Sequence, residues 1–169
     1  MALIGSILAA LGLGVFWVLV LRKGSVRTRI IQGPKGVRAA LDAYSKGKWD
    51  TVVAAAPGLL GAQSDGDEGQ WRPALELALG QSLLELGQAE EAIPHLERGL
   101  LLQSAWRRAH GRSDTPDPGE AKLRHLLGYA YFATNRPALA RREYHRVLDM
   151  DPLDPQVRAR VEASLSKLE

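Results

Sequence analysis

Three stretches of the chain share one layout: an apolar pattern with helical spacing, then a turn residue, then a second helical pattern. The stretches are residues 36–60, 73–100 and 121–152. Their turn residues are Gly47, Gly87 and Asn135. Glycine and asparagine tolerate the left-handed backbone conformation that ends a helix, so each stretch is predicted to be a helical hairpin. Three hairpins in succession, with no convincing strand pattern between them, predict an all-α fold.

Two glycines interrupt the first helices of the second and third stretches at matching places. Gly80 directly follows Leu79, and Gly128 directly follows Leu127. A glycine inside a helix costs ~1 kcal/mol relative to alanine. Close packing of a neighbouring helix would explain this cost, and we predict such packing at both glycines.

The pattern resembles that of the tetratricopeptide repeat (TPR) family over residues 35–168. The matching positions in the third stretch are Leu127, Gly128, Tyr131, Ala140, Tyr144 and Pro152. Those in the second are Leu79, Gly80, Leu83, Gly87, Ala92, Leu96 and Gly99, with Ser104 in place of the closing proline. The first stretch is degenerate, with Ala40 and Val52 in place of the family's glycine and alanine. The resemblance implies a short α-solenoid of about three TPR-like hairpins and a C-terminal capping helix.

The spacing departs from the 34-residue period of the family. The turns are 40 residues apart between Gly47 and Gly87, and 48 apart between Gly87 and Asn135. We expect two insertions to account for this: a polar loop at 64–70, and an extension of the preceding helix that loops out within 104–119. Asp154 is expected to cap the final helix.

The N-terminal segment is apolar over the length of a membrane span. Residues 2–21 contain no charged side chain, and 20 residues of helix measure ~30 Å, about the hydrocarbon thickness of a bilayer. Trp17 stands near the charged end, where interfacial aromatics occur. A cleaved signal peptide is the alternative, but no positive side chain precedes the run and no convincing small-residue cleavage site follows it. Residues 1–22 are therefore predicted to be a single transmembrane anchor.

Basic residues follow this anchor. Eight basic residues and one acidic residue lie between positions 22 and 48, whereas acidic residues are in excess afterwards. Residues 23–34 are expected to be a basic linker, and residues 35–169 the helical domain, on the cytoplasmic side. The expected membrane-surface residues are Arg22, Lys23, Arg27 and Arg29. The small residues Ser6, Ala10 and Gly14 share one face of the predicted span and are expected to pack against another transmembrane helix.

No pattern in the chain predicts catalysis or a cofactor. The chain has no cysteine, and its four histidines show no metal-ligand spacing. Asp149, Asp151 and Asp154 superficially resemble a calcium loop, but the loop glycine and the closing glutamate are missing, so a helix cap is favoured. No nucleophile–base pair is identifiable. We therefore expect no catalytic site, no metal site, no cofactor, no small-molecule substrate and no nucleic acid partner.

The TPR resemblance instead implies a peptide-binding groove along the first helices of the hairpins. The residues expected to line it are Leu41, Tyr44, Leu77, Gln81, Leu84, Lys122, His125, Tyr129 and Phe132. Such a surface suits an apolar or amphipathic helix of a partner protein. The alternative is that several of these residues are core and that the final helix folds over the groove. A second candidate surface comprises Trp106, Arg107, Arg108, His110 and Arg112, which suit an acidic partner, a lipid headgroup or RNA unless they are a solvated helix end.

These features predict a membrane-anchored scaffold that recruits or organises membrane-associated protein partners, or serves as a subunit of a larger membrane complex. The alternative is an assembly factor or regulator of an envelope enzyme or transport machine that acts through the span. The layout is similar to that of bacterial envelope-assembly TPR proteins with an N-terminal span. The composition, rich in alanine, arginine and glycine, is typical of a high-GC bacterium.

Overall fold

The computed structural model describes residues 36–61, 71–112 and 117–168, and within these ranges every regular element is a helix. The seven α-helices are α2 (Val37–Ser45), α3 (Trp49–Gly61), α4 (Trp71–Glu85), α5 (Ala89–Ala109), α6 (Pro118–Ala133), α7 (Pro137–Leu148) and α8 (Pro155–Leu165), with a short 3-10 helix at Ser166–Leu168. The all-α prediction is confirmed for these residues, and the arrangement is consistent with an α-solenoid.

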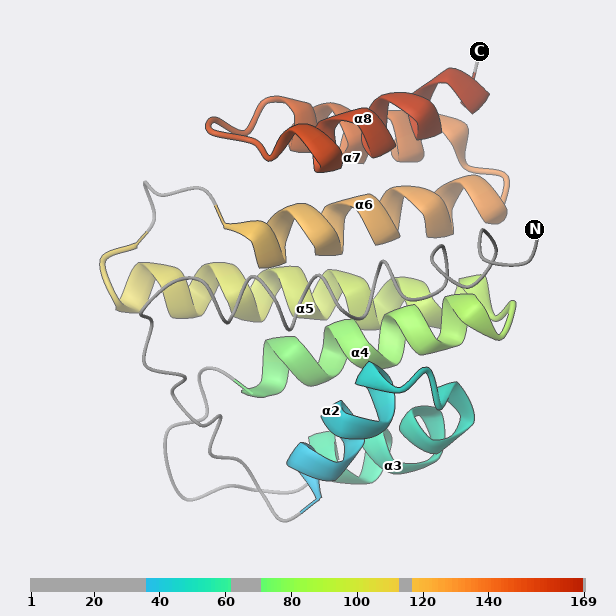
Figure 1. Ribbon diagram of the computed structural model, residues 1–169, viewed down its shortest axis with the longest axis vertical. Coiled ribbons are helices and arrows are strands. Elements are labelled where there is room, and N and C mark those ends of the chain that lie inside the picture. Colours follow the sequence, from blue (N-terminus) through green and yellow to red (C-terminus); the bar gives the residue numbers. More distant parts are fainter. Residues whose placement is uncertain (1–35, 62–70, 113–116, 169) are drawn as a thin grey trace, which may run out of the picture.

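The helices follow one another along the long axis of the molecule, from α2 and α3 at one end to α7 and α8 at the other (Figure 1). The hairpin partners α2–α3, α4–α5 and α6–α7 pack against each other, and each hairpin packs on the next. The first helices also meet, because α4 contacts both α2 and α6. These first helices form the face on which the sequence predicts the groove.

The three predicted turn residues end their helices as expected. Gly47, Gly87 and Asn135 have φ values of 68°, 79° and 59°. After Gly87, the Gln88 amide donates to the Leu83 carbonyl at 2.8 Å, the hydrogen bond that closes a left-handed helix end. The prediction made from these three residue types is confirmed.

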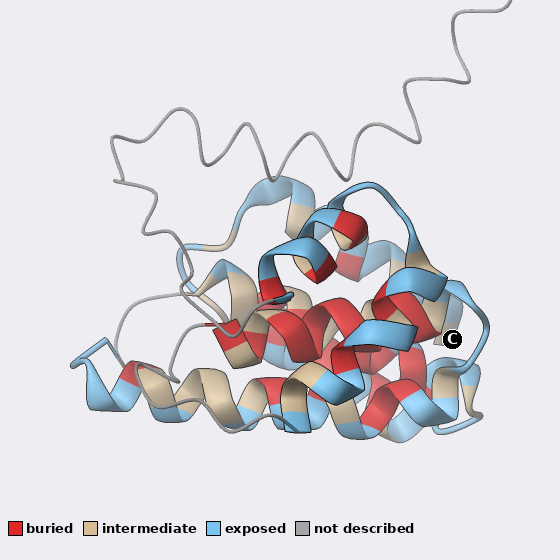
Figure 2. Ribbon diagram, turned by 90° about the horizontal axis from the view of Figure 1, so that it is seen from below, coloured by how far each residue is buried: buried red, intermediate tan, exposed pale blue. Residues whose placement is uncertain are grey.

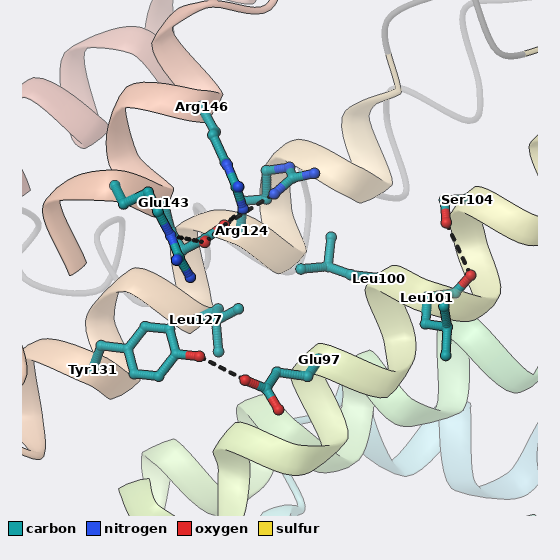
Figure 3. A pocket seen from close by; sticks show the side chains of 10 residues that line it. Glu97, Leu100, Leu101, Ser104, Arg124, Leu127, Tyr131, Glu143 and Arg146 are labelled. Atoms are coloured by element: carbon teal, nitrogen blue, oxygen red, sulfur yellow. Dashed lines mark hydrogen bonds and ion pairs between the residues drawn. The ribbon is translucent and has the colours of Figure 1, made fainter. Parts of the chain in front are cut away.

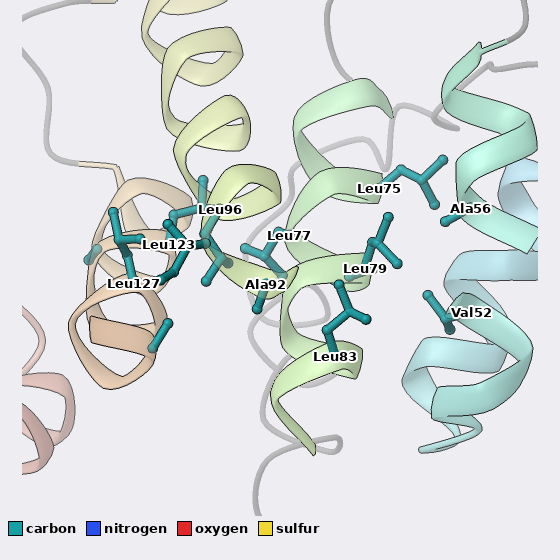
Figure 4. Close-up of a cluster of buried hydrophobic side chains, with 14 of the residues drawn as sticks. Val52, Ala56, Leu75, Leu77, Leu79, Leu83, Ala92, Leu96, Leu123 and Leu127 are labelled. Carbon is teal, nitrogen blue, oxygen red and sulfur yellow. The ribbon is translucent and has the colours of Figure 1, made fainter. Parts of the chain in front are cut away.

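The core runs continuously between the hairpins, and Figure 4 shows how leucines of α4 lie between side chains of α3 and α5. The predicted close packing at the two helix glycines is confirmed. A Cβ on Gly80 would lie 2.7 Å from the Leu96 side chain, and one on Gly128 would lie 2.5 Å from the Tyr144 ring. Figure 2 shows the buried residues gathered where the helices face one another.

The expected extension of the helix in the second hairpin and the expected cap of the final helix are also observed. Helix α5 continues to Ala109, as predicted, and α6 begins after Asp117, whose Oδ1 accepts from the Gly119 amide at 2.8 Å. Asp154 Oδ1 accepts from the Gln156 amide at 2.7 Å, so the carboxylate that superficially suggested calcium caps α8.

Several predictions fall on residues that the structure does not describe. These are the anchor at 1–22 with Ser6, Ala10 and Gly14, the basic linker at 23–34 with Arg22, Lys23, Arg27 and Arg29, and the loop at 64–70. Among the helices that are described, none is both long and apolar enough to cross a membrane.

Candidate functional site

The predicted groove residues lie on α2, α4 and α6, with different degrees of exposure. Leu77 is 9% exposed and belongs to the core. Leu41, Tyr44 and Leu84 are partly buried and pack against it. One residue of the set, Leu77, is therefore part of the core.

Three polar groups connect the first helices across this face. The Tyr44 hydroxyl on α2 donates a hydrogen bond to Gln81 Oε1 on α4. Lys122 on α6 places Nζ 2.6 Å from the Tyr44 hydroxyl and 5.2 Å from the centre of its ring. These contacts join α2, α4 and α6 across the face, and the Lys122 ammonium is the charged group among them.

Burial changes the titration of these groups. It raises the pKa of Tyr44 well above its ordinary value, with a smaller contribution from the charge of Glu85. It lowers the pKa of Lys122 to about 8, and the nearby charge of Arg160 on α8 acts in the same direction. Lys122 lacks a carboxylate partner among the described residues, and so does Arg160, which donates to the Gln156 carbonyl at 3.2 Å.

Helix α8 contacts α6 at His125. His125 Nε2 lies 3.2 Å from Ser164 Oγ, and its ring lies 5.8 Å from that of Tyr144. Burial lowers the pKa of His125 to about 4, again with help from Arg160, so the imidazole is neutral at neutral pH. The contact places Ser164 of α8 beside the middle of α6.

The second half of α6 carries an exposed aromatic pair. Tyr129 is 49% exposed and Phe132 is 40% exposed. Lys122, His125, Tyr129 and Phe132 recur at intervals of three and four residues, so they form one stripe on α6. We call Lys122, Tyr129, Phe132 and Arg160 the groove site. It offers apolar aromatic surface at one end and unpaired positive charge at the other.

Residues 83–163 match the family model of the tetratricopeptide repeat. The match begins near the end of α4 and extends into α8, so it covers the groove site and the second and third predicted turns. Tetratricopeptide repeats act as modules of protein–protein interaction and are typically non-catalytic, which indicates a protein-interaction scaffold. No curated protein and no solved structure matches the chain.

The second predicted surface is partly occupied by contacts that join two TPR helices. Arg107 is buried at the end of α5, where Nη1 lies 2.9 Å from Glu120 Oε2 on α6 and Nη2 donates to the Arg112 carbonyl at 2.8 Å. Trp106 stacks on His110 with ring centres 4.3 Å apart. Arg107 therefore holds α6 against the end of α5, while Arg108 and His110 remain exposed.

The sequence analysis missed two buried carboxylates, each between the two helices of a hairpin. Glu76 on α4 lies 2.8 Å from His95 Nδ1 on α5. Glu143 on α7 lies 2.9 Å from Arg124 Nη1 on α6. Both carboxylates are about 1% exposed. A signal for this pair was present in the sequence, because Glu76 and Arg124 each stand four residues before a helix glycine: the carboxylate lies on the first helix of one hairpin and on the second helix of the next.

Glu143 also lines a pocket of about 290 Å³ between α5 and α7, with α6 as its floor (Figure 3). Its lining residues are Glu97, Leu100, Leu101, Ser104, Arg124, Leu127, Tyr131, Arg142, Glu143 and Arg146. Within it the Tyr131 hydroxyl donates to Glu97 Oε1 at 2.6 Å. Burial, then the hydrogen bond to Glu97, raises the pKa of Tyr131 to about 12.

The described residues contain no group of three or more side chains placed to hold a metal ion. The expectation of no metal, no cofactor and no catalytic residue stays a prediction, as does the assignment of the groove.

Proposed function

We propose that this protein is a membrane-anchored TPR scaffold that holds a helical segment of a partner protein in its groove. The observation that carries the proposal is the groove site itself, where an exposed aromatic pair and two positive charges without carboxylate partners share one face. Exposed aromatic pairs are costly to leave in water unless a partner covers them. TPR modules use this face of the first helices for partners.

The groove site favours an amphipathic helix with an acidic side chain. The apolar face of such a helix would cover Tyr129 and Phe132, and its carboxylate would pair with Lys122 or Arg160. Lys122 and Tyr129 are seven residues apart, which is about 10 Å along α6. A partner helix with an apolar residue and an acidic residue about two turns apart matches this spacing.

The membrane part of the proposal rests on residues 2–21, which carry no charge. An anchor at residues 1–22 would confine the helical domain to the membrane surface, on the cytoplasmic side. Confinement raises the effective concentration of any membrane-bound partner without new contacts. The partners would accordingly be membrane-associated proteins, recruited or organised as parts of a larger complex.

The test is site-specific photocrosslinking of the full-length chain in its native membrane. A benzophenone amino acid at Phe132 should give a defined crosslinked protein, identified by mass spectrometry. The same amino acid at Arg158, an exposed position on α8, is the matched control. The crosslinked band should disappear when Tyr129 is changed to serine.

A band that forms equally from Arg158, or that survives Tyr129→Ser, would show that the groove site is not the binding surface. The absence of any band from Phe132 in the native membrane would count against the scaffold function itself.

A further inference from the structure

The pocket between α5 and α7 lies on a different surface from the groove site, because the second helices of the hairpins form its walls. Helices α5 and α7 each pack against α6. Their side chains leave the space between them open above α6 (Figure 3). The residues that line this pocket include none of the four residues of the groove site.

The α7 side of the pocket carries guanidinium groups with spare donors. Arg142 Nε lies 3.2 Å from Glu143 Oε1, and Arg146 Nη1 lies 2.9 Å from the same oxygen. Arg124 adds Nη1 at 2.9 Å from Glu143 Oε2. One carboxylate is therefore shared by three guanidinium groups. Arg142 and Arg146 are each about half exposed, and each uses a single nitrogen for Glu143, so the remaining N–H groups of their planar forks face solvent.

The α5 side of the pocket carries two leucines, with Glu97 and Ser104 beside them. Leu100 and Leu101 line it, and Leu101 is 64% exposed, the most exposed large apolar side chain among the described residues. The pocket thus has a cationic wall opposite a wall that carries two leucines. Its three arginines outnumber the two carboxylates, Glu97 and Glu143, and Glu97 already accepts a hydrogen bond from Tyr131.

The corresponding place in the preceding hairpin has fewer guanidinium groups, because Pro94 stands where Arg142 stands and only Arg98, at the place of Arg146, is kept. There Glu76 stands where Arg124 stands on α6, and His95 stands where Glu143 stands on α7. An acidic ligand would meet the buried carboxylate of Glu76 on α4 in the preceding hairpin, but the guanidinium of Arg124 on α6 in this pocket. The positive wall is therefore a property of this pocket and not of every gap between second helices.

We infer that this pocket binds an extended segment of a protein partner in which acidic and aliphatic residues alternate. Successive side chains of an extended chain point to opposite sides. A segment that runs between α5 and α7 would direct its carboxylates to Arg142 and Arg146 and its aliphatic side chains to Leu100 and Leu101. Guanidinium forks bind carboxylates through paired, charge-assisted hydrogen bonds, which supplies orientation as well as attraction.

The experiment measures fluorescence anisotropy of a fluorescein-labelled peptide, GDLDLG-amide, with the full-length protein in a mild non-ionic detergent at low salt. The peptide GNLNLG-amide has the same shape without the charge. The protein variant is Arg142→Gln with Arg146→Gln, which leaves Arg124 to hold Glu143. Its control is Arg141→Gln with Arg158→Gln, which removes the same two charges from exposed positions outside the pocket.

Loss of a charge-assisted contact is expected to weaken binding of the acidic peptide by about tenfold or more. We expect this loss when the uncharged peptide replaces the acidic peptide, and also when the pocket variant replaces the unaltered protein. The control variant should bind the acidic peptide like the unaltered protein. Leu101→Ser changes the opposite wall without touching Glu143, and should weaken binding by about fivefold as part of a leucine contact is lost. A benzophenone in place of one peptide leucine should attach to residues 97–104 of α5.

Four results would overturn the inference. They are no binding of the acidic peptide, equal binding of the uncharged peptide, an equal loss in the control variant, and attachment of the benzophenone to α6 at the groove site. None of them bears on the photocrosslink from Phe132, so failure of this pocket and failure of the scaffold function are distinguishable.

Discussion

Substituting alanine for Gly128 should destabilise the fold, although alanine is the better helix former. In an open helix the change would stabilise by ~1 kcal/mol. At Gly128 the new methyl group would lie 2.5 Å from one carbon of the Tyr144 ring and 2.7 Å from another. Carbon atoms at optimal separation are ~3.5–4.0 Å apart. The ring is rigid and fully buried, so α6 and α7 must separate for the methyl group to fit.

Overpacking of this kind costs ~1–3 kcal/mol, or occasionally more. Because the site is rigid we place the cost at the upper end, so the net loss after the gain in helix propensity is ~2 kcal/mol. For a chain of this size the loss corresponds to a fall of ~4–8 °C in the melting temperature. The assay is thermal unfolding of the full-length chain, followed by far-ultraviolet circular dichroism.

Gly58→Ala is the matched control. Gly58 also lies inside a helix, but a Cβ there would meet nothing within 4 Å. This variant should be as stable as the unaltered protein or more so, by up to ~1 kcal/mol. If Gly128→Ala melts at the same temperature as Gly58→Ala, the close approach of α6 and α7 is not what requires glycine, and the reasoning fails.

Further predictions concern the ion pairs, the titration and the anchor. Changing Arg107 to methionine should destabilise by ~1–3 kcal/mol because a buried charge-assisted hydrogen bond to Glu120 is lost, whereas exposed Arg108→Met should change urea unfolding little. The pKa of His125 is lowered in the folded chain from 6.5 to about 4, so the unfolded chain binds more protons between these values. His125 should therefore contribute to a loss of stability as the pH falls from 6.5 to 4, and His125→Asn should show a shallower fall over that range in urea unfolding. If residues 1–22 anchor the chain, the full-length protein should stay in the membrane pellet after alkaline carbonate extraction, and a chain that lacks them should be released; release of both would refute the anchor.

The parts of the fold that sequence reasoning could predict have local causes. Gly87 ends α4 through its own backbone conformation. Asp154 caps α8 because its carboxylate accepts a hydrogen bond from the amide of Gln156, only two residues further along the chain. Gly80 differs from these two residues. The low helix propensity of glycine indicated that another helix packs closely at this position, but it did not identify the neighbouring residue. The structure shows that the neighbour is Leu96.

The parts that could not be predicted depend on contacts between residues far apart in the chain. Lys122 reaches Tyr44 across 78 positions, and no local pattern shows that these two groups meet. Leu77 fits the groove pattern as well as Tyr129 does, yet Leu77 is buried in the core and Tyr129 is 49% exposed. Glu143 was overlooked because a glutamate is usually a surface residue, and only its guanidinium neighbours make its burial favourable.

The buried carboxylate lies on the first helix of one hairpin and on the second helix of the next, and this difference affects which helices can pair during folding. Repeat proteins are prone to exchange equivalent helices, since neighbouring repeats offer similar apolar faces. If α4 took α7 as its hairpin partner, Glu76 would be buried beside Glu143, and the two carboxylates would have to share the guanidinium groups of Arg142 and Arg146 without that of Arg124. If α6 took α5, Arg124 would face His95 and Arg98. Each first helix is thus paired more stably with its own second helix than with that of the neighbouring hairpin. The order of the repeats therefore depends on charge as well as on loop length.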